Sequence, residues 1–111
     1  MIDWLRVAEL RDEIGGEDFE EVAALFLEEV ADAIAGLDEA GNNARAMETQ
    51  MHALKGSALN LGFKALADIA YAGERAAATG DTRAVLPDEV RRVFEASVDD
   101  FQRNRAEKLA A

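Results

Sequence analysis

Hydrophobic residues recur along this chain at the spacing of one helical face, in segments separated by turn residues. One such segment runs from about residue 17 to 37, and its apolar positions follow the i, i+3, i+4, i+7 pattern of a helix with one buried side. A second runs from about 44 to 61, between the turn signal Gly41-Asn42-Asn43 and Gly62. Both segments therefore predict amphipathic helices. The apolar stripe of the second consists of Met47, Met51, Leu54, Ala58 and Leu61.

Caps and breakers predict three further helices. Asp3 can cap a short first helix, which Gly15-Gly16 ends. A helix over about 63–79 is rich in alanine and glycine, so a neighbouring helix can approach it closely. Pro87 stands near the first position of a last helix, where its missing N–H is harmless. With no clear strand signal, the fold class is all-α, and we expect an antiparallel four-helix bundle with a short additional N-terminal helix, one domain over residues 1–111.

The net charge of the chain disfavours two classes of binding partner. The formal net charge is −11, with half of the residues apolar and about a third charged. A nucleic-acid binder or a ligand of anionic membranes needs a basic surface, so both classes are disfavoured. No apolar stretch approaches the roughly 20 residues that span a bilayer. Because the N-terminus also lacks a basic segment followed by an apolar one, we expect a complete, cytoplasmic chain. A compact bundle with a charged, solvated surface is expected to be a monomer.

Candidate side-chain chemistry converges on one residue. The chain has no cysteine and a single histidine, His52, in the middle of the helix predicted over 44–61. At about 100° per residue, His52 lies roughly 140° from the centre of the apolar stripe. The imidazole therefore points away from the core. That orientation suits a nucleophile, which must be reachable and unprotonated at one nitrogen.

Apolar and small neighbours share the outward face. Leu59 lies at roughly 120° from the stripe, and Phe63 would lie at roughly 160° if the helix ran one turn past Gly62. Two large apolar side chains beside an exposed imidazole suggest a surface for a partner protein. Gly56 lies one turn after His52, inside the predicted helix, where a glycine costs about 1 kcal/mol relative to alanine. This cost suggests that the glycine leaves space for a partner's approach; the alternative is that a stable helix simply tolerates it.

Polar neighbours leave alternatives open. Lys55 lies at roughly 80°, where it can swing towards a group carried by the ring or lie along the surface. Glu48, one turn before the histidine, can steady a protonated ring or stay solvated. Ser57, at roughly −80°, can bond the preceding turn or a neighbouring helix.

The region around the histidine resembles the signature of histidine-containing phosphotransfer (HPt) domains. The similar residues are His52-Ala53-Leu54-Lys55-Gly56-Ser57, Asn60-Leu61-Gly62, Leu66, Phe26-Leu27-Glu28-Glu29, Glu74 and Gly80-Asp81. The resemblance implies a helical bundle that carries a phosphoryl group between aspartates of receiver domains, which belong to response regulators or hybrid histidine kinases. Ala58, Phe63, Ala70 and Gly73 depart from the family pattern and touch packing and docking more than chemistry.

The resemblance also implies roles for individual residues. His52 would accept the phosphoryl group through Nε2, Lys55 would neutralise it, Gly56 would clear the approach, and Gly62 would set the turn. Leu59, Phe63 and Ser57 complete the expected partner-binding set. No cofactor is expected in the chain itself, because the receiver would bring Mg²⁺.

The chain lacks the Gly-x-x-x-x-Gly-Lys-Ser/Thr loop, so we expect a carrier without autonomous kinase activity.

Two other functions compete with phosphotransfer. A plain adaptor bundle would bind a partner through the same face and leave His52 incidental. A carboxylate metal bundle needs two inward Glu-x-x-His pairs, and this chain has one histidine, with Thr49 three residues before it.

Overall fold

The computed structural model describes residues 1–110, which form five helices and no strand. The all-helical prediction is therefore confirmed, with helix ends shifted by a few residues at most. The second helix starts one residue before the expected position and runs three residues past the expected end. The helices are α1 (Trp4–Ile14), α2 (Gly16–Ala40), α3 (Ala44–Leu61), α4 (Lys64–Ala78) and α5 (Pro87–Lys108).

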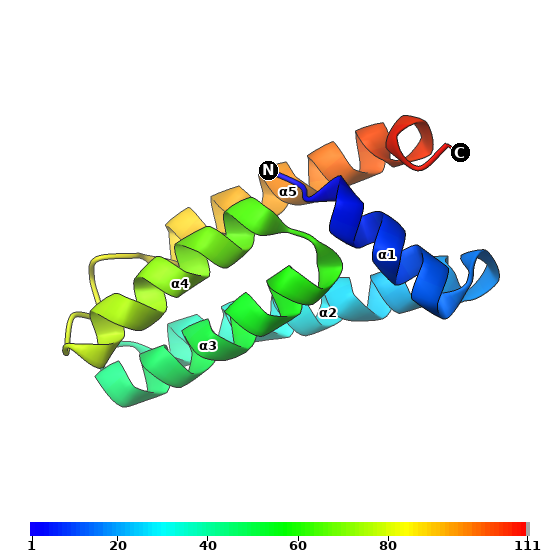
Figure 1. Ribbon diagram of the computed structural model, residues 1–111. Helices are drawn as coiled ribbons and strands as arrows, with labels where there is room; N and C mark the ends of the chain where they lie inside the picture. Colours follow the sequence, from blue (N-terminus) through cyan, green and yellow to red (C-terminus); the bar gives the residue numbers. More distant parts are fainter. Residues whose placement is uncertain (111) are drawn as a thin grey trace.

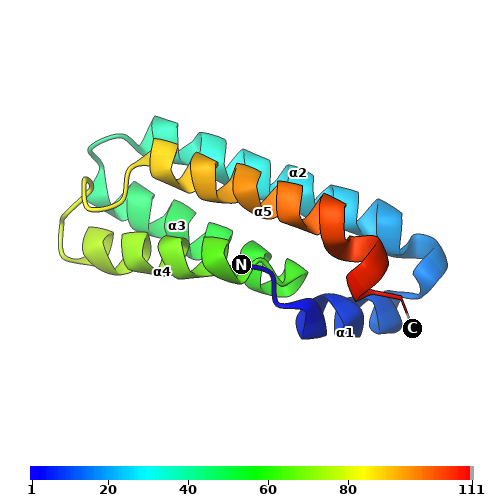
Figure 2. The ribbon, with the colours of Figure 1, turned by 90° about the horizontal axis from the view of Figure 1, so that it is seen from above.

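The four longer helices lie side by side and α1 lies across one end of them (Figures 1 and 2). The resulting bundle measures 46 × 19 × 18 Å. α3 packs against both α2 and α4, while α5 contacts α2 and α4 from the remaining side. Among these described helices, none combines the length and the apolar character that crossing a membrane requires.

The predicted stripe of α3 forms the centre of the core. All five of its members are buried, and Met51, Leu54, Ala58 and Leu61 have no exposed surface at all. The small residues of α4 bring its backbone close to α3. A Cβ added to Gly73 would lie 2.6 Å from the terminal methyl of Met51, so a larger residue there would force the Met51 side chain to move. This close approach brings the outward faces of α3 and α4 next to each other.

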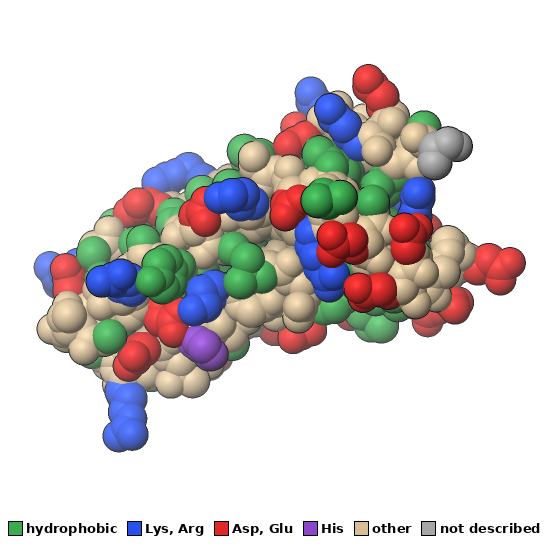
Figure 3. Space-filling view, in the orientation of Figure 1, with side chains coloured by type: hydrophobic (Ala, Val, Ile, Leu, Met, Phe, Trp, Pro, Cys, Tyr) green, Lys and Arg blue, Asp and Glu red, His purple; other side chains and the backbone are tan. Residues whose placement is uncertain are grey.

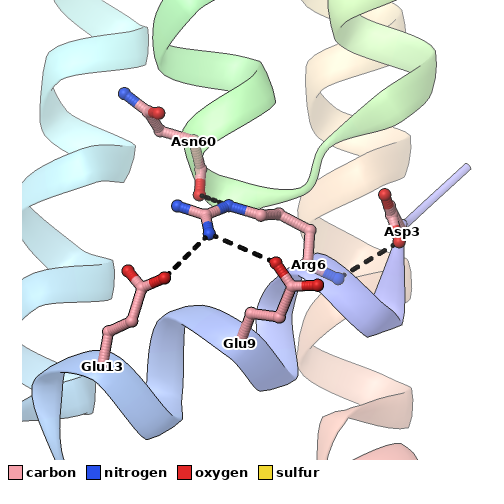
Figure 4. Close-up of polar contacts among 5 residues, drawn as sticks. All are labelled: Asp3, Arg6, Glu9, Glu13 and Asn60. Atoms are coloured by element: carbon pink, nitrogen blue, oxygen red, sulfur yellow. Dashed lines mark hydrogen bonds and ion pairs between the residues drawn. The ribbon is translucent and has the colours of Figure 1, made fainter.

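The N-terminal segment fastens α1 to the end of α3 (Figure 4). The Asp3 side chain caps α1 by accepting a hydrogen bond from the Arg6 backbone N–H at 3.2 Å, as the sequence predicts. The Arg6 side chain donates to the carbonyl of Asn60, 3.1 Å away. Glu13 and Glu9 hold the same guanidinium at 3.5 and 3.6 Å. A cation at the C-terminal carbonyls of α3 also complements the helix dipole.

Gly62 forms the turn between α3 and α4, as the sequence predicts. It adopts the left-handed conformation, with φ 86°, and its N–H bonds back to the last turn of α3. A Cβ at this position would lie 2.8 Å from the Asp3 carbonyl oxygen. Both the backbone angle and the crowding require glycine. The turn therefore fixes where α4 begins relative to the histidine-bearing helix.

Candidate functional site

His52 lies on the outer surface of α3, where the sequence places it. Its side chain is 69% exposed, whereas Met51 and Leu54 on the same helix are fully buried. Figure 3 shows the histidine on the surface, with acidic, basic and hydrophobic side chains around it. The imidazole is thus held by the fold and remains open to solvent and to a partner.

A carboxylate from α4 holds both the histidine and the lysine. Glu74 Oε2 lies 2.7 Å from His52 Nδ1, and Glu74 Oε1 lies 2.7 Å from Lys55 Nζ. The Glu74 side chain is only 18% exposed and the Lys55 side chain 23%. Lys55 does lie next to His52, but at rest its ammonium group pairs with Glu74. The site is therefore a triad from two helices.

Geometry fixes which imidazole nitrogen is available. The Lys55 ammonium holds the pKa of the Glu74 carboxyl below its ordinary value; partial burial opposes this effect and His52 reinforces it. An ionised carboxylate only accepts hydrogen bonds, so Nδ1 must carry the proton that it shares with Glu74. In the neutral ring Nε2 is then the nitrogen with the free lone pair. Within residues 1–110, Nε2 has no hydrogen-bond partner.

Replacing Glu74 with glutamine should remove this electrostatic link. We expect the free energy of unfolding to fall by about 1 kcal/mol near neutral pH. Loss of this mostly shielded carboxylate removes the ionic partner of both His52 and Lys55. The folded pKa is lowered, so the wild-type advantage is complete above the ordinary value of 4.5 and disappears as the pH falls through the lowered one. Urea unfolding of both proteins between about pH 7 and pH 3 measures the difference.

Glu48→Gln is the matched control for that measurement, since Glu48 lies one turn before His52 and pairs with none of the described residues. Its stability relative to the wild type should change little with pH. A Glu74→Gln difference that stays constant over the whole pH range would show that the pairing contributes nothing to the folded state.

Two of the expected neighbours lie where the sequence predicts. Leu59 is 53% exposed, two turns along α3 from His52. Gly56 is exposed as well, and a Cβ built on it would meet no atom within 4 Å. The surface beside the imidazole is therefore open, with one large apolar side chain at its edge.

Phe63 and Ser57 correct the expected partner-binding set. Phe63 has no exposed surface, because the chain turns at Gly62 instead of continuing the helix. Its ring packs against Phe101 with centroids 5.6 Å apart. Ser57 is 7% exposed and donates to Glu29 Oε1 on α2 at 3.1 Å, so it bonds a neighbouring helix. Neither side chain is available to a partner in this conformation.

Sequence periodicity alone did not identify Glu74. It lies 22 residues after His52 on a different helix, and only the family resemblance drew attention to it. The predicted alternative partner, Glu48, makes no hydrogen bond or ion pair with the ring in the described part of the chain. Residues 1–110 contain no group of three or more histidine, cysteine or acidic side chains that could hold a metal ion.

Comparison with known proteins identifies the family of this chain. The family model of the Hpt domain matches residues 21–104. The matched region covers most of α2 and α5 and all of α3 and α4, and it includes the His52, Lys55 and Glu74 triad. No curated protein and no solved structure matches the chain significantly.

Proposed function

The chain belongs to the Hpt domain family, and we propose that it carries a phosphoryl group on His52 between receiver-domain aspartates in a two-component phosphorelay. Hpt domains are phosphocarriers rather than enzymes, and their partners are receiver domains. One observation carries the assignment to His52: an exposed imidazole whose Nδ1 is tied to a carboxylate, which leaves Nε2 as the nucleophile.

The transfer step follows from that tautomer. Nε2 attacks the phosphorus of a receiver's aspartyl phosphate, the bond between phosphorus and the carboxylate oxygen breaks, and the aspartate leaves as a carboxylate. The ring gains positive charge because Nδ1 keeps its proton. Glu74, 2.7 Å from Nδ1, offsets that charge in both directions of transfer. Both phosphorylated groups are high in energy, so the reverse step onto another aspartate needs no additional reagent.

Lys55 is the group we assign to phosphate neutralisation. Its ammonium is 2.7 Å from Glu74, and the same carboxylate binds the imidazole, so a modest movement of a flexible side chain brings the charge to a phosphoryl group on Nε2. Glu74 then acts as the resting partner of a cation that the phosphoryl group recruits. We expect the receiver to supply Mg²⁺ and most of the catalytic groups.

The role also sets expectations for the whole molecule. We propose an antiparallel four-helix arrangement of α2 to α5 within a single domain, and a monomer. The side-by-side packing of these helices supports the arrangement (Figure 2). The chain carries no nucleotide-binding loop of the Gly-x-x-x-x-Gly-Lys-Ser/Thr kind, which supports a carrier without its own kinase activity.

Gly56 tests whether the open surface serves docking. Gly56→Leu should raise the free energy of unfolding by about 1 kcal/mol, since leucine favours a helix and the added side chain meets open space. The same side chain should obstruct a receiver and slow transfer from it. Gly56→Ala should give the stability gain with little obstruction. Thermal unfolding and transfer rates measure the two effects, and unchanged transfer in the leucine variant would remove the docking role.

Transfer from phosphorylated receivers tests the proposed function itself. Each receiver domain of the same cell is phosphorylated with a labelled small phosphodonor and mixed with the chain. At least one should pass the label on as an acid-labile, base-stable adduct, the behaviour of a phosphoimidazole. An adaptor bundle would bind a receiver and take no label, so the absence of transfer from every receiver overturns the proposal.

A further inference from the structure

An exposed tyrosine and an exposed arginine of α4 lie directly beside the histidine site. Tyr71 is 47% exposed, and its ring centroid lies 5.1 Å from Lys55 Nζ. One turn later, the Arg75 guanidinium lies 5.7 Å from the same centroid and donates to the Tyr71 hydroxyl at 3.3 Å. The ring thus contacts two cations, and one of them belongs to the triad with His52.

Only one of the two cations has a carboxylate partner among residues 1–110. Lys55 is paired with Glu74 at 2.7 Å. Arg75 has no carboxylate within ion-pair distance among residues 1–110, although the chain has a net charge of −11. By contrast, α2 carries acidic side chains and no lysine or arginine. A positive charge without an internal partner therefore stands on the ring that contacts Lys55, in a chain with a net negative charge.

The position of Arg75 is restricted as well as exposed. Stacking on an aromatic ring and a bond to its hydroxyl limit the rotamers of a long side chain, so less entropy is lost when a partner binds it. Tyrosine and arginine are also the residue types that protein interfaces favour. The Tyr71 ring also links α4 to the exposed side of α3, because it contacts Lys55, the residue before the open Gly56.

We propose that Arg75, presented on the ring of Tyr71, is a specificity-determining contact that favours receivers with an acidic side chain on the surface around their phosphorylation pocket, outside the carboxylates that hold Mg²⁺. The inference rests on the proposed function and adds which receivers are accepted. A charge at the edge of an interface acts mainly on the rate of encounter and on the choice of partner, and salt screens it. Arg75 is thus a docking group that leaves the chemistry on Nε2 unchanged.

Charge reversal at Arg75 tests this inference. The probe is the phosphorylated receiver domain that labels the wild-type chain fastest. Arg75→Glu should lower the transfer rate at subsaturating receiver by about tenfold in low salt, with little change at saturation, and the difference should shrink as salt rises. Arg75→Lys should restore part of the rate. Lys108→Glu, with the same charge change on an exposed residue near the end of α5, is the matched control.

The platform is tested separately. Tyr71→Ala removes the ring and should weaken receiver transfer in the same sense, whereas Tyr71→Phe keeps the ring and should retain most of the rate. Phosphoramidate, a donor too small to dock, should label His52 at the same rate in all variants. Equal receiver transfer for Arg75→Glu and Lys108→Glu, or slower labelling of Arg75→Glu by phosphoramidate, would overturn the inference. A wild-type chain that no receiver labels would instead overturn the proposed function.

Discussion

Replacing His52 with glutamine is expected to abolish phosphoryl acceptance completely while leaving the fold intact. Glutamine has a side chain of similar length but no nucleophilic nitrogen, so the attack on an aspartyl phosphate has no starting point. The side chain is 69% exposed and its hydrogen bond is to Glu74, so the free energy of unfolding should fall by no more than about 1 kcal/mol. Transfer of label from a phosphorylated receiver and circular dichroism measure the two effects.

The matched control for His52→Gln is Asn60→Ala, on the same helix and also exposed. It should accept phosphate at the wild-type rate. Label on the His52→Gln chain at more than background would assign the phosphoryl group to another residue. Loss of label from the control as well would indicate a general disturbance of α3 instead of a missing nucleophile.

The sequence was sufficient for the directions of side chains within α3. The outward direction of His52 and the burial of the stripe through Met51 and Leu54 both follow from 3.6 residues per turn. The same spacing placed Leu59 and Gly56 on the open face, where the structure has them. Periodicity states which residues share a face of a helix, and that information is local.

The interactions between helices needed the structure. Glu74 reaches His52 because α4 packs closely on α3, with Gly73 lying against the Met51 side chain. A stripe of small residues predicts that some helix comes close, but it gives neither the identity of that helix nor its register along α3. The network of Tyr71 with Lys55 depends on the same register, so the second cation beside the site was also outside the reach of sequence periodicity.

Phe63 shows how one wrong assumption reverses a conclusion. Its outward angle holds only if α3 continues past Gly62, but that residue ends the helix in the left-handed conformation. Phe63 instead precedes the first residue of α4, and its N–H bonds to the Ala58 carbonyl at 2.8 Å. The redirected ring enters the core near the stacked rings of Trp4 and Phe101. Where a glycine follows an apolar stripe, the helical periodicity should therefore not be extended past that glycine.

Phe63→Ala should consequently be among the most destabilising single substitutions in the chain. Removing a fully buried phenylalanine ring costs about 3–5 kcal/mol, through lost burial and through the cavity left beside Phe101. Such a loss is a large share of the stability of a small domain. Urea unfolding measures it, and Phe63→Leu, expected to lose about 1–2 kcal/mol, keeps the measurement possible if the alanine variant does not fold.

Leu59→Ala is the matched comparison for the Phe63 variants, since it removes an apolar side chain four residues earlier that is 53% exposed. Its free energy of unfolding should change by less than about 0.5 kcal/mol, while its transfer from a receiver should slow if the open face of α3 is the docking surface. The opposite pattern would contradict the burial seen here: a Phe63→Ala chain as stable as the wild type but slow in transfer would mean that the aromatic ring faces the partner.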